Sequence, residues 1–317
     1  TVPPGALGMR TTLTISRMVD PLVPEGINLE FRPAGLRFAK PATITVPITA
    51  KLLADNVIAD AAGLQGAAVS TESGLLEKLT VQSIDSSART ATFSLPHFSF
   101  ATFFSCATEP IGLRPVGFTT AHPRSNRILV LVHGVAANGF AFDGSGSGSS
   151  AGTDLVSLVS DPNSALAQRY DHAYSFHYPW RFGVAGVNVA ETVSWPMPQE
   201  LGFSSTSGPR RPTHYLRDFL AGLAARGYAC DLVGHSMGGL VCRYALEQID
   251  SNGTARSAVR TLVMLGTPNQ GALSSSALAA VDDGCAVSSP DASSVDLARG
   301  DLLPGSIVLT LLNAGSL

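Results

Sequence analysis

One stretch of the sequence, Tyr228–Gln248, restricts the fold more than any other. An apolar run over residues 229–233 is broken at Gly234, and apolar residues then recur at three- and four-residue spacing. This order predicts a buried strand, a tight turn and a helix. The turn contains the pentapeptide GHSMG at Gly234–Gly238, which has the form G-x-S-x-G. Small residues on both sides of such a serine let strand and helix approach closely while the serine holds a strained backbone.

Ser236 is therefore the candidate nucleophile, with its hydroxyl above the N-terminus of the predicted helix. At that point the backbone N–H of Met237 and the positive end of the helix dipole can stabilise an oxyanion. The alternative is that Ser236 merely caps a helix. Because the strand before it and the helix after it are both indicated, we favour the nucleophile.

A second motif lies about a hundred residues upstream. The continuous apolar run Arg127–Val132 is typical of a strand buried on both faces of a parallel sheet, and it leads directly into His133-Gly134. In folds with a serine elbow, the second oxyanion donor comes from an early loop between a strand and a helix. We assign it to the N–H of Val135, with Ala136 as the open alternative. His133 is interpreted as a hydrogen-bonded loop residue rather than a proton shuttle.

The N-terminal third of the chain has a different character. Alternating and β-branched runs, separated by clusters of Pro, Gly, Asp and Ser, predict an all-β sandwich over residues 1–105, and only Ala50–Ala62 could be helical. All three lysines lie in the first quarter of the chain. Residues 106–124 carry three prolines and little periodicity, which predicts a linker. The 317-residue chain is long enough for a second, α/β domain over residues 125–317.

Further elements are predicted in this second domain. Residues 173–178 and 260–265 read as buried strands. A helix is expected over residues 214–226, with Thr213 as its N-cap and Gly227 as its terminator. Helical periodicity also covers residues 153–170, with an interruption near Asp161-Pro162, and Ser306 is placed to cap a last helix.

Composition excludes several classes of function. A net charge of −3 provides no extended basic field for nucleic acid or an anionic membrane, and no run of about 18 apolar residues could span a bilayer. The four cysteines lack zinc-ligand spacing, so we expect no metal, while a Cys106–Cys285 disulfide stays open. The GSGSGSSAG segment at residues 144–152 lacks the GK[ST] ending of a phosphate loop, and we expect a flexible loop beside the cleft.

Three motifs in the second domain together carry a resemblance. The strand followed by HG, the segment GHSMGGLVCRYAL and the segment LGTPNQGAL are similar, in this order, to the lipase and esterase branch of the α/β-hydrolases, which contains the bacterial triacylglycerol lipases. The resemblance covers residues 127–317. It implies a mostly parallel sheet flanked by helices and cofactor-free transfer of an acyl group from an ester or lipid to water. The matching positions are Ser236 as nucleophile, Met237 and Val135 as oxyanion donors, and Gly266–Pro268 as a bordering loop.

The sequence departs from that family in one respect. The triad of this fold runs serine, acid, histidine along the chain, yet all seven histidines precede Ser236. The later aspartates fall in loops and at helix ends, so none is assigned to the triad. We therefore expect a C-terminally truncated hydrolase domain. The parent protein would be active, and this chain nearly inactive.

The first hundred residues resemble the ZU5-type β-sandwich and its bacterial relatives through the segments VPPGALG, PAGLRFAKPATITVPI and LPHFSFATFF. The combination of such a sandwich with a lipase-like domain resembles exported or envelope proteins, so we expect a secreted or cell-envelope protein. Surface or protein contacts through the sandwich are also expected. Some such domains cut themselves within an HFS tripeptide. Here Ser99 would attack the carbonyl of Phe98, with His97 as the base. We favour the alternative, in which Phe98 fills the sandwich and His97 ends a turn.

Two other functions compete with ester hydrolysis. An acyltransferase on the same scaffold would pass the acyl group to an alcohol instead of water. A non-catalytic binding or adhesion protein would use the β-sandwich and carry a degenerate hydrolase domain. The intact elbow, HG strand and GTP loop argue against degeneration, because decay would be expected to change at least one of them.

Overall fold

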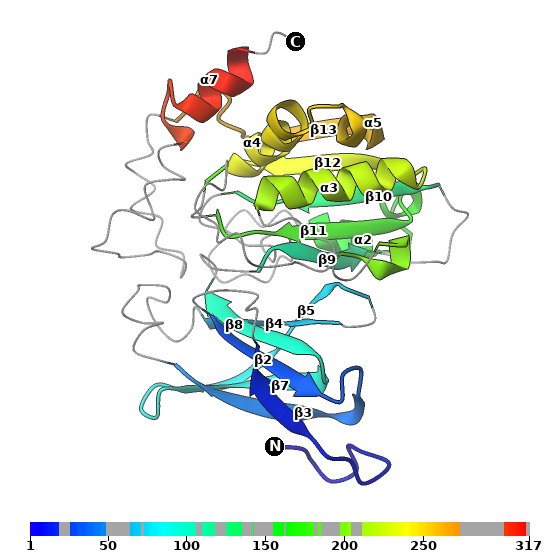
Figure 1. Ribbon diagram of the computed structural model, residues 1–317, viewed down its shortest axis with the longest axis vertical. Helices are drawn as coiled ribbons and strands as arrows, with labels where there is room; N and C mark the ends of the chain where they lie inside the picture. The colour runs from blue at the N-terminus through cyan, green and yellow to red at the C-terminus, as the bar shows by residue number, and fades with distance from the viewer. Residues whose placement is uncertain are drawn as a thin grey trace.

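A computed structural model describes most of the chain (Figure 1). The described residues are 1–18, 26–48, 64–70, 73–105, 110–117, 125–134, 142, 155–161, 163–180, 183–184, 197–203, 211–272 and 301–314. The strands are β1 (Thr14–Arg17), β2 (Ile27–Arg32), β3 (Arg37–Pro47), β4 (Leu64–Val69), β5 (Leu76–Lys78), β6 (Val81–Asp85), β7 (Thr90–His97), β8 (Phe100–Ser105), β9 (Gly112–Gly117), β10 (Arg127–Val132), β11 (His172–His177), β12 (Ala229–His235) and β13 (Val259–Leu265). The helices are α2 (Leu155–Ser160), α3 (Pro212–Ala225), α4 (Met237–Tyr244), α5 (Thr254–Ala258) and α7 (Ile307–Ala314), with the short helical segments η3 (Ala167–Arg169), η5 (Gln199–Leu201) and η6 (Ala245–Ile249).

Every described element before residue 106 is a strand. They form a five-stranded sheet, ordered β1-β2-β8-β4-β5, and a three-stranded sheet, ordered β3-β7-β6. Buried and partly buried residues alternate along β7, as period-2 patterning requires when one face meets a core. Phe93 and Phe103 meet between the sheets with ring centroids 4.8 Å apart. The helix considered for Ala50–Ala62 lies outside the described residues.

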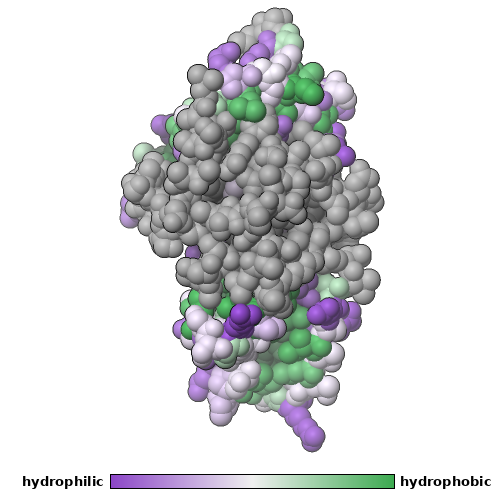
Figure 2. All heavy atoms as spheres, turned by 90° about the vertical axis from the view of Figure 1, so that its left-hand side faces the viewer, coloured by the Kyte–Doolittle hydropathy of each residue, from purple (hydrophilic) through white to green (hydrophobic). Residues whose placement is uncertain are grey.

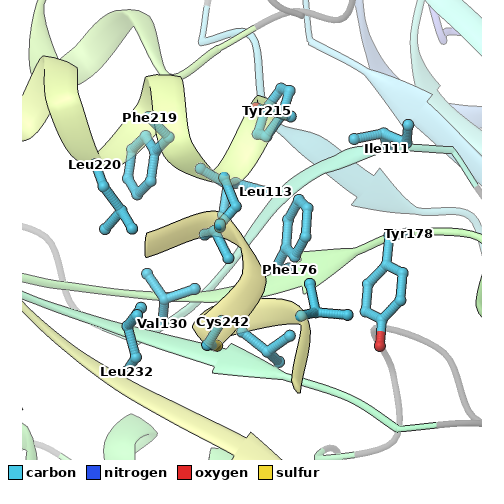
Figure 3. Packing of buried hydrophobic residues seen from close by; sticks show 14 of the residues in the cluster. Ile111, Leu113, Val130, Phe176, Tyr178, Tyr215, Phe219, Leu220, Leu232 and Cys242 are labelled. Atoms are coloured by element: carbon cyan, nitrogen blue, oxygen red, sulfur yellow. The ribbon is translucent and has the colours of Figure 1, made fainter. Parts of the chain in front are cut away.

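The second half of the chain builds one mixed sheet, ordered β13-β12-β10-β11-β9. The four strands β10 to β13 run parallel, and β9 is antiparallel to β11. The apolar run predicted as a doubly buried strand is β10, with the predicted bounds. Alternate β10 side chains enter two cores: Val130 packs with α3 and α4 (Figure 3), and Leu129 packs with Val159 of α2. Helices therefore cover both faces, which makes this half an α/β fold.

The linker predicted over residues 106–124 is wrong for residues 112–117, which form β9. This strand pairs with β11 at the edge of the sheet, and its register shifts between Ala173 and Tyr174, where Pro115 is paired. A proline is tolerated in an edge strand and at a bulge, because it cannot donate a ladder hydrogen bond. The proline that suggested a linker is thus compatible with an edge strand.

The first five-stranded sheet and the α/β half share one hydrophobic core. Leu76 of β5 and Leu113 of β9 belong to the same cluster of buried side chains. The turn before β5 also touches the segment at 197–203: the N–H of Gln199 donates to Ser73 O at 2.7 Å, and a Cβ on Gly74 would lie 2.1 Å from Met197 O. The absence of a side chain at Gly74 is what permits this approach.

Helix boundaries in the second half follow the local signals with two exceptions. Of the helix expected over residues 153–170, the described residues form only α2 (Leu155–Ser160) and the short turn η3 (Ala167–Arg169). Gly227, which follows the C-cap residue Arg226 of α3, has φ +74°, and Leu309 N–H donates to Ser306 Oγ at 3.2 Å, so both predicted end signals are used. The predicted N-cap Thr213 is wrong. Helix α3 begins at Pro212 after Arg211, because proline fits the first helical position and Thr213 is buried in the first turn.

Figure 2 shows green, hydrophobic surface above and below the grey atoms. Several large hydrophobic side chains of the described residues are exposed. They include Met9 and Ile15 near the N-terminus, Val263 and Met264 on β13, and Ile307 on α7. The strand predicted over residues 260–265 is present as β13, but the prediction that it is buried is wrong, because β13 is an edge strand of its sheet and its residues are exposed or partly exposed. No helix within the described ranges is long and apolar enough to span a membrane.

Candidate active site at the strand–helix elbow

Ser236 stands alone between β12, which ends at His235, and α4, which begins at Met237. Its backbone has φ 50° and ψ −123°, a conformation that non-glycine residues rarely adopt. Neighbouring backbone groups hold it there: Ser236 N–H donates to Leu265 O at 2.8 Å, and Gly239 N–H donates to Ser236 O at 3.2 Å. The strained elbow predicted from the sequence is present.

Glycines surround the elbow because there is no room for a Cβ atom. A Cβ on Gly234 would lie 2.6 Å from Gly239 Cα, so strand and helix touch through two glycines. A Cβ on Gly238 would lie 2.2 Å from Val132 O, so the first turn of α4 rests on the end of β10. These contacts would force any larger residue to displace backbone atoms, which fixes the direction in which Ser236 is presented.

The same contacts bring the three sequence motifs together. A Cβ on Gly134, in the HG motif, would lie 2.8 Å from Ser236 Cβ. A Cβ on Gly239 would lie 2.0 Å from Thr267 Oγ1, in the GTP motif. Segments separated by more than 130 residues of sequence, from Gly134 to Thr267, therefore converge on one serine.

Of the two predicted oxyanion donors, one can be placed. Met237 is the first residue of α4, so its N–H has no acceptor within the helix, while its side chain is buried. Val135 and the alternative Ala136 lie outside the described residues, although Gly134 directly before them is described. Ser236 is partly exposed, and its hydroxyl makes no hydrogen bond to any other described residue. The hydroxyl and the Met237 N–H are thus available to a ligand.

His133, in the HG motif, has a structural role, as predicted. His133 is fully buried, and its Nδ1 lies 2.9 Å from Gly134 O. Because a carbonyl only accepts, Nδ1 is assigned the proton. The His133 ring also stacks on Tyr178, with centroids 4.2 Å apart. A ring held on both sides in this way does not reach out as a base for Ser236.

His235 directly precedes the nucleophile candidate. Partial burial of its ring, and then the nearby His133, lower the pKa of His235 from its ordinary value of 6.5. The imidazole is therefore neutral at pH 7 and adds no positive charge beside Ser236. Its Nδ1 would lie 3.3 Å from a Cβ on Gly134, which places this ring over the HG motif.

No triad partner emerges among the described residues after Ser236. The acids there are Glu247, Asp250 and Asp301, and each has another partner. Glu247 pairs with Arg243, Asp250 accepts from Arg256 N–H at 2.8 Å, and Asp301 accepts from Val184 N–H at 2.7 Å. Four more aspartates follow Ser236 but lie outside the described residues: Asp282, Asp283, Asp291 and Asp296. The GSGSGSSAG segment and the two cysteines considered for a disulfide, Cys106 and Cys285, also lie outside them.

The HFS tripeptide lies in the β-sandwich. Phe98 is buried, and its ring packs against Phe31 and Phe38 at centroid distances of 5.2 and 5.0 Å, which is the packing role we favoured. His97 does not end a turn as expected: it is the last residue of β7 and is buried, and its Nε2 lies 2.8 Å from Glu77 Oε2. Ser99 Oγ donates to the carbonyl of Phe100 at 3.2 Å, so this hydroxyl is directed to the backbone in the structure.

Fold and site together define an α/β protein with a serine elbow at the carboxyl ends of its central parallel strands. No family model and no curated protein matches the chain. Two structures of Bacillus licheniformis lipase BlEst2 are similar to it. The mature form has a TM-score of 0.33 and 16% identity over 64% of this chain and 62% of that one, and the propeptide form a TM-score of 0.34 and 15% identity over 64% and 34%. The chain spans less than two thirds of either protein, and both TM-scores lie below 0.5, so the function proposed below rests on the local geometry of the elbow.

Proposed function

We propose that the protein is a serine carboxylic-ester hydrolase of the α/β-hydrolase type, with Ser236 as its nucleophile. The observation that supports this most directly is the positive φ of Ser236, a serine where glycine would be less strained. A helix cap does not require such strain, since capping residues usually have extended backbones. Strain maintained by four tightly packed glycines is better explained by a need to present the hydroxyl.

In the proposed reaction Ser236 Oγ attacks the ester carbonyl and forms a tetrahedral intermediate. The N–H groups of Met237 and Val135 stabilise its oxyanion, the alcohol leaves, and water then releases the acid from the acyl-enzyme. A general base must accept the serine proton, and the sequence has no histidine after Ser236. We therefore expect only residual hydrolysis by these 317 residues alone, and the experiments below use the protein expressed from its whole gene.

Three finer features belong to the same proposal. The substrate is an ester or a lipid, as the resemblance to lipases and esterases implies, and acyl transfer through a serine needs no cofactor. The protein acts in the cell envelope or after secretion, and a ZU5-like sandwich contacts a surface or another protein. The last two rest on the sequence resemblance and on no contact in the structure.

Covalent labelling with a fluorophosphonate tests the proposal, because the reagent reacts with activated serines. We expect the whole-gene protein to be labelled at Ser236, as located by peptide mass spectrometry, and Ser236→Ala to abolish labelling. Ser16→Ala is the matched control, since Ser16 is an exposed serine in β1 and should leave labelling unchanged.

Each alternative function predicts a different result. A non-catalytic binding protein would show no labelling of the whole-gene protein, and this outcome would refute the proposal. An acyltransferase would be labelled at Ser236, but an ester offered together with excess alcohol would give mainly the new ester. A hydrolase gives mainly the free acid in the same assay.

A further inference from the structure

A tyrosine that belongs to none of the sequence motifs contacts the HG motif next to the elbow. Tyr178 follows β11 and is fully buried. Its hydroxyl donates to the carbonyl of His133 at 2.5 Å, and its ring stacks on the His133 imidazole at 4.2 Å with an interplanar angle of 18°. One side chain therefore contacts both the backbone and the side chain of the residue that precedes Gly134.

His133 in turn contacts the backbone of Gly134, which borders Ser236. Its Nδ1–H donates to Gly134 O at 2.9 Å, so the carbonyl of Gly134 is held by a ring that Tyr178 supports. The carbonyl oxygen of His133 also borders the elbow, because a Cβ on Gly238 would lie 2.4 Å from it. The two peptide units that flank Gly134 are thus fixed between Tyr178 on one side and Ser236 on the other.

Tyr178 is itself held by a column of rings. Phe176 stacks on Tyr178 at 5.5 Å and 20°, and Tyr215 of α3 stacks on Phe176 at 5.7 Å and 18°. Figure 3 shows these three side chains in a row, from Tyr215 through Phe176 to Tyr178. The column ends in the core between the sheet and α3, so Tyr178 has little freedom to move away from His133.

We propose that Tyr178 is a positioning residue for the oxyanion site, acting through His133 on the peptide units around Gly134. This inference rests on the proposed hydrolase function. The predicted donor, the amide of Val135, belongs to the peptide unit that begins at the Gly134 carbonyl. A planar trans peptide directs its N–H opposite to its C=O, so a partner that holds the carbonyl also orients the amide.

The size of the effect follows from the chemistry of oxyanion stabilisation. Complete loss of one oxyanion donor costs roughly 100- to 1000-fold in kcat. Tyr178→Phe keeps the ring stack and removes only the hydrogen bond to His133 O, so the donor is misoriented rather than lost. We expect a fall of about 10- to 100-fold in kcat, with KM changed less than about twofold, because the donor acts mainly on the transition state.

The experiment compares Tyr178→Phe with Tyr215→Phe in the whole-gene protein. Both variants lose one buried tyrosine hydroxyl from the same column of rings, and the hydroxyl that donates to His133 O is that of Tyr178. Hydrolysis of a short p-nitrophenyl ester is measured per active site, titrated with a fluorophosphonate, so that a misfolded fraction lowers the titre and leaves kcat unchanged. Inhibition by an alkylboronic acid, which forms a tetrahedral adduct, is compared with inhibition by the carboxylate product.

We expect Tyr178→Phe to lower kcat per site and weaken the boronic acid about 10-fold or more, with product inhibition unchanged, while Tyr215→Phe retains kcat. An unchanged kcat per titrated site in Tyr178→Phe, or equal losses in both variants, overturns the inference. If the wild-type protein is not labelled at Ser236, the proposed function fails instead, and the two failures are thereby distinguished.

Discussion

The strain at Ser236 predicts an unusual response to mutation. At φ 50° and ψ −123° a non-glycine residue costs about 1–3 kcal/mol, whereas glycine adopts such angles freely. Glycine also raises the entropy of the unfolded chain, which costs about 0.5–1 kcal/mol relative to alanine. We therefore expect Ser236→Gly to be more stable than Ser236→Ala by roughly 0.5–2 kcal/mol. The hydroxyl, unbonded among the described residues, is absent from both variants and cancels in the comparison.

Urea denaturation followed by circular dichroism measures this difference. The same two substitutions at Ser16, in the ordinary strand β1, provide the control. There alanine should be the more stable variant by about 0.5–1 kcal/mol, because glycine weakens a strand. The sign of the glycine effect should thus reverse between the two positions. Equal signs, with Ser236→Gly below Ser236→Ala, would refute strain at the elbow.

Three further outcomes are expected. Gly238→Ala should lower the free energy of unfolding by about 3 kcal/mol in denaturant titration, because its Cβ would lie 2.2 Å from a β10 carbonyl, whereas Gly8→Ala, with open space around it, should be neutral. A hydrogen bond from His97 lowers the pKa of Glu77 below its ordinary 4.5. The pair therefore stabilises the fold above that pH, and this stabilisation is lost as the pH falls and Glu77 is protonated. Glu77→Gln should flatten the acid side of the stability–pH curve, and an unchanged curve would contradict this. On a denaturing gel an intact band is expected, and a fragment ending at Phe98 would instead establish self-cleavage.

Local parts of the site could be predicted from the sequence because their partners are close along the chain. Strand β12, Ser236 and α4 are consecutive, and the conformation of the turn depends on glycines within three residues of the serine. The bounds of β10 were likewise readable, since a continuous apolar run is typical of a strand covered on both faces. The end signals at Gly227 and Ser306 are local in the same sense.

Contacts between distant segments could only be decided by the tertiary structure. The sequence gives no reason to connect Tyr178 with His133, because their 45-residue separation is closed only when β10 and β11 pair in parallel. Pro115 was interpreted as part of a linker, because the sequence does not show that it lies in an edge strand. At an edge position the missing N–H of proline removes no hydrogen bond between strands. The sequence thus determined which serine is strained. Packing between strands determined which groups face it, because side-chain neighbours across a sheet depend on register and strand order rather than on local pattern.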